Sequence, residues 1–145
     1  MRAIPLREEL GWQPDPDDIV AAVGDRTRVL VVTNPGNPTG IRLGDEARAA
    51  VVRAAEQSGA WILADEVYTG AAPDGHETPS FFGAAERVVA TGSLSKAYGL
   101  PGLRVGWTVS SPDVAARLWA RTDYTTISPG ELTDRLAATA LDPAV

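Results

Sequence analysis

Short apolar runs that end at turn residues predict where the strands of this chain lie. Residues 29–32, 61–64 and 87–91 are runs of this kind, and valine, leucine, isoleucine and alanine supply most of their side chains. A short apolar run between turn signals is typical of a strand that is buried on both faces. The sequence therefore predicts three buried strands, each separated from the next by a long connection.

Helical spacing and cap residues predict four helices around these strands. Residues 43–57 place alanine and valine at intervals of three and four and are closed by Ser58-Gly59. An acidic cap and a proline in the first turn predict a helix over 15–23. Further helices are expected over 111–121 and 128–141, because a Ser-Pro pair begins each of these segments.

The order of the elements predicts the fold class. Strands that are separated by helical crossovers are expected to pair in parallel within a sheet whose two faces are covered. The third strand is reached through an irregular stretch over 70–83, and 92–104 leave no room for a helix, so 105–109 should form an antiparallel strand. We therefore expect an α/β fold of three layers, with a mostly parallel sheet and helices on both faces.

The composition narrows the classes of function and partner. The chain has 145 residues, which is one domain's worth of sequence but small for a complete two-domain cofactor enzyme. Its 13 basic and 19 acidic residues give a net charge of −6 without a basic run, so no nucleic-acid partner is expected. Cysteine is absent and histidine occurs once, so we expect no metal site and a solvated loop position for His76.

Hydropathy along the chain argues against a membrane location. No apolar stretch reaches the length that spans a bilayer, and residues 1–5 lack the apolar segment of a signal peptide. The expected location is therefore the cytoplasm, with no membrane partner. Any catalysis would have to use lysine, carboxylates and tyrosine.

Polar side chains follow each of the three predicted strands at the point where the strand ends. Residues 34–40 follow the first strand, 65–68 the second and 93–96 the third. In an open α/β sheet, ligands bind outside the carboxyl ends of the strands. We therefore expect these three segments to converge on one site.

Lys96 has a setting that suits covalent chemistry. Small, hydroxyl-bearing and turn-forming residues surround it, and the next basic residue downstream is Arg104. A desolvated lysine loses its proton more easily, and its neutral amine can attack a carbonyl. Pyridoxal phosphate (PLP) needs such a lysine for a Schiff base with its aldehyde, together with groups that keep its pyridine nitrogen protonated and hold its phosphate. Lys96 is the candidate catalytic residue.

The other candidates supply the remaining contacts that PLP requires. Asp65 can pair with the pyridine nitrogen, whereas its neighbour Glu66 should point elsewhere. The phenolic oxygen could accept hydrogen bonds from Asn37 and Tyr68. The contacts to the phosphate could come from the hydroxyl of Ser93 and from Arg104, whose planar fork fits phosphate oxygens.

Each candidate also has an ordinary structural explanation when it is taken alone. The Pro, Gly and Asn residues at 34–40 are typical of two consecutive turns. Asp65 fits a solvated strand end, Tyr68 fits a packed aromatic ring, and Arg104 fits a surface ion pair. Their joint occurrence, in order and at the ends of strands, favours the cofactor site instead.

The combined motifs resemble those of the class I/II aminotransferases, the fold-type I PLP enzymes. They read Asn-Pro-Gly-Asn-Pro-Thr-Gly at 34–40, Asp-Glu-Val-Tyr at 65–68, Ser-Leu-Ser-Lys at 93–96 and Gly-Leu-Pro-Gly-Leu-Arg-Val-Gly at 99–106. The combination is highly specific and extends over essentially the whole chain. The resemblance implies the same roles for the residues named above, and a PLP-dependent aminotransferase as the function.

The reaction that the resemblance implies moves an amino group between an amino acid and a 2-oxo acid. PLP is held by Lys96 as an internal aldimine, from which the incoming amino acid displaces the lysine. The freed amine of Lys96 then carries a proton between the substrate's alpha carbon and the cofactor. The full-length protein is expected to be a homodimer, as family members generally are.

Parts of the family pattern cannot be assigned to this chain. A glycine-containing phosphate loop and a ring-stacking aromatic residue usually lie upstream, and a small domain with a carboxylate-binding arginine lies downstream. The resemblance thus implies that residues 1–145 are a partial PLP-binding large domain, without the N-terminal part and the C-terminal small domain. The activity of these residues alone stays open.

Two alternatives remain at this point. Residues 123–129 look similar to a subgroup that includes capreomycidine synthase, in which PLP drives the cyclisation of an arginine derivative. A synthase, lyase or cyclase of the same fold is therefore one alternative to transamination. The other is a non-catalytic truncated remnant that keeps the fold without turnover.

Overall fold

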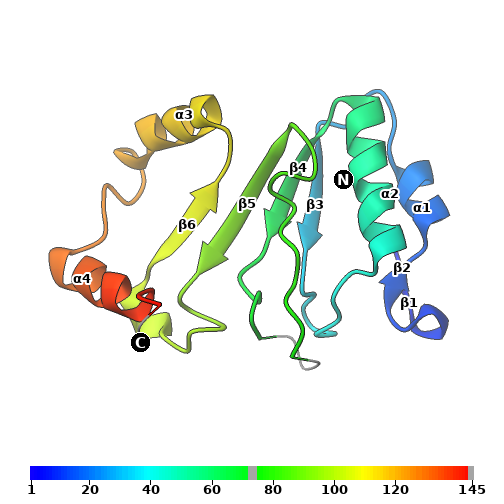
Figure 1. Cartoon of the computed structure of the whole chain (residues 1–145). Helices are drawn as coiled ribbons and strands as arrows, with labels where there is room; N and C mark the ends of the chain where they lie inside the picture. Colours follow the sequence, from blue (N-terminus) through cyan, green and yellow to red (C-terminus); the bar gives the residue numbers. More distant parts are fainter. Residues whose placement is uncertain (72–74, 144–145) are drawn as a thin grey trace.

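The structure is a computed structural model that describes residues 1–71 and 75–143 (Figure 1). Its strands and helices are, in chain order, β1 (Leu6–Arg7), β2 (Gln13–Pro14), α1 (Pro16–Ala22), β3 (Val29–Thr33), α2 (Asp45–Ser58), β4 (Trp61–Asp65), β5 (Val88–Ser93), β6 (Gly106–Val109), α3 (Pro112–Thr122) and α4 (Glu131–Ala140). Short 3₁₀ helices lie at Glu8–Leu10 and Pro101–Leu103. The strands and helices predicted from the sequence are all present, with ends that differ by up to three residues.

The central sheet has the order β3-β4-β5-β6. β3, β4 and β5 are parallel, and β6 is antiparallel to β5, as the short connection before it predicts. The carboxyl ends of the parallel strands lie at the same edge of the sheet, the lower edge in Figure 1. The register pairs Thr33 with Asp65 and Asp65 with Thr91, so the predicted site segments begin next to one another.

One face of the sheet packs against α2, which in turn packs against α1. Side chains alternate between the two faces along a strand, so every second residue contributes to this core. The buried hydrophobic cluster consists of Ile19, Leu30, Ala47, Ala50, Val51, Ala54, Ala55, Ala60, Ile62, Ala64, Phe81, Val88 and Ala90. Small alanine side chains on α2 allow the helix to lie close to the sheet, and Gly59 ends the helix in the left-handed conformation at φ 67°.

The opposite face of the sheet carries exposed apolar side chains. Val29 and Val31 of β3 and Leu63 of β4 all point to this face, and Val31 is 69% exposed. The α/β fold predicted from the sequence is thus confirmed, with a mixed sheet and a helical layer of α1 and α2 on one side. The described residues leave these three side chains uncovered.

The N-terminal segment is tied to α1 by local contacts. Asp15 caps α1 by accepting a hydrogen bond from the backbone N–H of Asp17, at 2.9 Å, as its position before Pro16 predicts. Arg7 of β1 donates to the carboxylate of Asp18, and this hydrogen bond raises the pKa of Arg7 above its usual range. The two-residue strands β1 and β2 are too short to give a periodic signal, and the sequence did not predict them.

The C-terminal quarter of the chain follows β6, and its helices α3 and α4 lie at the opposite end of the sheet from α1 and α2 (Figure 1). α3 has no buried residue, and Trp119 on it is 72% exposed. α4 approaches the 3₁₀ helix Pro101–Leu103. Among the described residues, no helix is both long enough and apolar enough to cross a membrane.

Candidate functional site

The loop after β3 folds back on itself and presents Asn37 to solvent. Asn34 is almost fully buried, and its Oδ1 accepts a hydrogen bond of 2.9 Å from the backbone N–H of Leu43. The N–H of Gly36 donates to the carbonyl oxygen of Ile41 at 2.8 Å, which closes the loop. The peptide bonds before Pro35 and Pro38 are both cis. Residues 34–40 can therefore form consecutive turns and also contribute to a binding site, because the tight turns bring Asn37 to the loop surface.

Asn37, Tyr68 and Lys96 come together from three separate loops. Asn37 Nδ2 donates a hydrogen bond to Tyr68 Oη at 3.0 Å. Lys96 Nζ lies 5.6 Å from the centre of the Tyr68 ring, within range of a cation–π contact. The convergence that the sequence predicts at the strand ends is thus observed for one residue of each segment.

Asp65 is the last residue of β4 and is hydrogen-bonded to both neighbouring strands. Its backbone carbonyl accepts from the N–H of Asn34 at 3.0 Å. Its Oδ1 accepts from the N–H of Val67 at 3.4 Å and from Thr91 Oγ1 at 3.3 Å. The half-buried carboxylate is therefore fixed to its own loop and to β5.

Glu66 points away from this group, as expected from the sequence. Its Oε1 accepts a hydrogen bond of 2.7 Å from the backbone N–H of Phe81, whose side chain is fully buried in the core. Arg48 of α2 lies over the Phe81 ring, with its guanidinium carbon 5.0 Å from the ring centre. Glu66 thus anchors the connection between β4 and β5 to the loop that carries Asp65 and Tyr68.

Lys96 lies in a tight turn directly after β5. The Ser93 hydroxyl lies 3.3 Å from the carbonyl oxygen of Val105 and accepts from the N–H of Ser95 at 3.0 Å. The fully buried side chain of Leu94 anchors the turn, while the Lys96 side chain is exposed. The desolvated surroundings that the sequence suggested for Lys96 are therefore not provided by the described residues. Sequence neighbours that are small or apolar do not bury a lysine when the turn projects it outward.

The side chain of Arg104 contacts the turn that carries Lys96. Its Nη1 donates to the carbonyl oxygen of Pro101 at 2.8 Å and lies 3.4 Å from Ser95 Oγ. The backbone of Arg104 is left-handed, with φ 55°, a region that residues other than glycine rarely occupy. Ser95, for which no role was predicted, contacts both Ser93 and Arg104. Its hydroxyl directly before Lys96 was the available signal.

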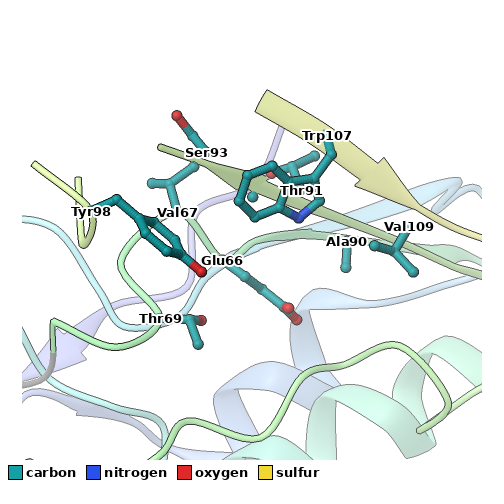
Figure 2. A pocket seen from close by; sticks show the side chains of 10 residues that line it. Glu66, Val67, Thr69, Ala90, Thr91, Ser93, Tyr98, Trp107 and Val109 are labelled. Atoms are coloured by element: carbon teal, nitrogen blue, oxygen red, sulfur yellow. The ribbon is translucent and has the colours of Figure 1, made fainter. Parts of the chain in front are cut away.

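A cavity of about 150 Å³ lies beside this region and is lined by Glu66, Val67, Thr69, Ala90, Thr91, Gly92, Ser93, Tyr98, Trp107 and Val109 (Figure 2). The rings of Tyr98 and Trp107 meet edge to face with their centres 6.4 Å apart. Of the predicted site residues, Ser93 lines the cavity, whereas Lys96 and Arg104 do not. The cavity is therefore separate from the group formed by Asn37, Tyr68 and Lys96.

Acidic and histidine side chains do not suggest a metal centre. Within 1–71 and 75–143, they form no group of three or more that could hold a metal ion. His76 is exposed in the connection between β4 and β5.

Comparison with known proteins identifies the family. Residues 1–144 match the family model described as aminotransferase class I and II. The chain belongs to this family, and the fold, the order of the motifs and their meeting at one edge of the sheet agree with that membership.

Named relatives and a solved structure give the same result. The chain is 40% identical to capreomycidine synthase from Streptomyces vinaceus over 99% of its own length, and 33% identical to arginine–pyruvate transaminase from Pseudomonas aeruginosa over 79%. It covers 37% and 30% of those proteins. A PLP-dependent aminotransferase from Streptococcus suis superposes with a TM-score of 0.82 at 34% identity, over 91% of this chain and 35% of the other. The chain thus spans about a third of the length of the proteins it matches.

Proposed function

We propose that this chain is the cofactor-binding part of a PLP-dependent aminotransferase, which moves an amino group between an amino acid and a 2-oxo acid. The observation that carries the proposal is the meeting of Asn37, Tyr68 and Lys96, with Asn37 and Tyr68 joined by a hydrogen bond of 3.0 Å. Family membership supports the same activity. The carboxyl edge of a parallel sheet is where α/β proteins bind ligands, and these three side chains meet there.

The chemistry of the side chains at this edge fits the ring of PLP. Lys96 supplies the primary amine that bonds to the aldehyde. Tyr68 Oη accepts its hydrogen bond from Asn37, so its own proton is left to donate to the phenolic oxygen of the cofactor. Asn37 retains a second amide proton for the same purpose. Asp65 would face the pyridine nitrogen and stabilise its protonated form.

The side chains around the Lys96 turn fit the phosphate of PLP. Arg104 offers a planar, permanently charged fork, and its Nη1 already lies 3.4 Å from the Ser95 hydroxyl. Ser93 provides a second hydroxyl in the same turn. A cation and two hydroxyl groups are the donors that a phosphate dianion prefers. Arg104, Ser93 and Ser95 would therefore contribute donors to the phosphate end of the cofactor.

Asp65, Lys96 and Tyr68 would each have a separate role in the reaction. When bound, PLP supplies an electron sink that stabilises negative charge at the alpha carbon of an amino acid. Asp65 would stabilise the protonated ring nitrogen, so that the ring can accept negative charge from the alpha carbon. Lys96, whose side chain is exposed, would take a proton from the alpha carbon of the amino acid and deliver it to the cofactor. Tyr68 lies against Lys96 and orients its amine.

We also propose that residues 1–145 are the central part of a large domain that flanking sequence completes. The exposed Val29, Val31 and Leu63 support this arrangement, because an uncovered apolar sheet face is unusual in a finished domain. The flanking sequence would add the N-terminal part of the large domain and a small domain that binds the substrate carboxylate. The complete protein would act as a cytoplasmic homodimer.

A cyclisation or related synthase reaction is the second candidate. The identity of 40% to capreomycidine synthase extends over 99% of this chain, whereas the match to arginine–pyruvate transaminase covers 79%. The same charge stabilisation at the alpha carbon serves both outcomes, since the fate of that carbon decides between transfer and ring closure.

A single-turnover experiment on the longer protein separates the candidates. The PLP-loaded protein is mixed with individual amino acids, including arginine and arginine derivatives, and products are identified by mass spectrometry. One equivalent of 2-oxo acid per active site, absent in Lys96→Ala, supports transamination. A cyclic amino acid formed without loss of nitrogen supports the synthase reaction. If wild type and Lys96→Ala give the same products, neither function holds.

A further inference from the structure

Thr91 and Asp65 are direct neighbours across two parallel strands. Their Cα atoms are register partners between β5 and β4, so their side chains leave the sheet on the same face. Thr91 Oγ1 lies 3.3 Å from Asp65 Oδ1. The backbone supports the pair, because the N–H of Glu66 donates to the carbonyl oxygen of Thr91 at 2.9 Å.

Both donors around the Asp65 carboxylate converge on one of its oxygens. Oδ1 receives the hydroxyl of Thr91 and the N–H of Val67, whereas Oδ2 has no hydrogen-bond partner within the described residues. Thr91 Oγ1 is also 3.4 Å from the carbonyl oxygen of Ala64, but a charged carboxylate is the stronger acceptor. The arrangement therefore fixes the rotation of the carboxylate and leaves Oδ2 free for a ligand.

We propose that Thr91 is a positioning residue, which holds Asp65 so that Oδ2 faces the pyridine nitrogen of PLP. This inference rests on the proposed function, because it assigns a partner to the carboxylate of that same site. Thr91 touches neither the substrate nor the cofactor and acts only through Asp65. The sequence placed Thr91 at the end of a predicted strand and gave it no role, since a threonine in a strand is ordinary.

Two variants separate the hydroxyl of Thr91 from the shape of its side chain. Thr91→Val keeps the β-branched form and removes the donor, whereas Thr91→Ser keeps the donor and removes a methyl group. Crystal structures of the cofactor-free chain would show the rotation of Asp65 in wild type and in both variants. PLP titration, followed by its visible absorbance as a function of pH, gives the affinity and a spectroscopic signature. Urea unfolding without PLP reports any general loss of stability.

We expect the effects to follow the loss of the Thr91 hydroxyl, so that they occur in Thr91→Val and not in Thr91→Ser. In Thr91→Val the Asp65 carboxylate rotates away from its wild-type position and PLP affinity falls about tenfold, the loss of one hydrogen bond to a charged group. The pH midpoint of the visible band moves upward, because a less protonated ring withdraws fewer electrons. Thr91→Ser restores all three properties, while urea unfolding changes little in either variant.

Two results would overturn the inference while the proposed function stands. One is an unchanged Asp65 rotation in cofactor-free Thr91→Val. The other is a Thr91→Val chain that binds PLP with wild-type affinity and the same absorbance profile. If wild type itself fails to bind PLP at Lys96, the proposed function is overturned together with the cofactor half of this inference. The crystal structures then still decide whether Thr91 orients Asp65.

Discussion

Asn37 Nδ2 donates a hydrogen bond to Tyr68 Oη at 3.0 Å, and this bond joins the loops that follow two adjacent parallel strands. The two residues are 31 positions apart, so the contact exists only because β3 and β4 end at the same edge. Lys96 lies over the same tyrosine ring. Tyr68 is therefore the residue through which the three loops are connected.

A double-mutant cycle tests whether this bond matters for the cofactor. We expect Tyr68→Phe to weaken PLP binding about fivefold, which corresponds to about 1 kcal/mol for one hydrogen bond. Asn37→Ala should add less when Tyr68 is already replaced than it does in wild type, because both changes remove the same contact. Equilibrium titration of PLP absorbance measures the four affinities. Tyr98→Phe is the matched control, because Tyr98 meets Trp107 rather than Asn37; strictly additive effects of Asn37 and Tyr68 would contradict the coupling.

Replacing Arg104 should separate phosphate binding from backbone strain. Arg104 occupies the left-handed region at φ 55°, which costs a residue with a side chain about 1 kcal/mol relative to glycine. Arg104→Gly should therefore raise the free energy of unfolding by about 1 kcal/mol, measured with urea. The same variant should weaken PLP binding about tenfold, since a charge-assisted hydrogen bond is lost.

The ligand provides the control for Arg104. Pyridoxal, which lacks the phosphate, should bind wild type and Arg104→Gly equally well. Arg104→Lys should give an intermediate PLP affinity, because it keeps the charge without the fork. An equal loss of affinity for pyridoxal and PLP would show that Arg104 does not bind the phosphate.

Glu66 should contribute to stability through a single backbone contact. Its Oε1 accepts from the N–H of Phe81 at 2.7 Å, next to a fully buried ring. Glu66→Ala leaves this N–H without its partner and should lower the free energy of unfolding by about 1–3 kcal/mol. Glu66→Gln retains an oxygen acceptor and should lose less than half of that amount. Urea unfolding compares the two, and equal losses would mean that the hydrogen bond is not the cause.

The packing of Trp107 on Gly92 should make any larger residue at position 92 destabilising. A Cβ at Gly92 would lie 2.4 Å from the indole of Trp107, which is far inside contact distance. Gly92→Ala should therefore lower the free energy of unfolding by about 1–3 kcal/mol as β5 and β6 adjust. Gly102→Ala is the control, because nothing lies within 4 Å of its added Cβ. Similar urea midpoints for the two variants would refute the close packing.

The fold was predictable because its signals are local. Short apolar runs ended at polar motifs, and the missing helix before β6 required an antiparallel strand, which the structure confirms. Asp15 and Gly59 marked helix ends through cap chemistry that depends on neighbouring residues only. The hairpin of β1 and β2 was missed, because strands of two residues carry no period.

The site was only partly predictable, because contacts between distant residues depend on register. The motifs indicated that Asn37, Tyr68 and Lys96 lie near one another, but not that Asn37 donates to Tyr68. The contacts of Thr91 with Asp65 and of Ser95 with Arg104 depend on how β4, β5 and the turn at Arg104 are arranged, so the sequence did not reveal them. The exposure of Lys96 could not be anticipated from its small and apolar neighbours, because the direction of a turn is not encoded in their hydropathy.

The most direct test of the central claim is to reduce the purified chain with borohydride in the presence of PLP and to map the modified peptides by mass spectrometry. Reduction makes the bond between PLP and its lysine permanent. We expect a phosphopyridoxyl group on the peptide that contains Lys96, and no such group in Lys96→Ala. An absence of labelling, or a label elsewhere that persists in Lys96→Ala, would contradict a PLP site at Lys96.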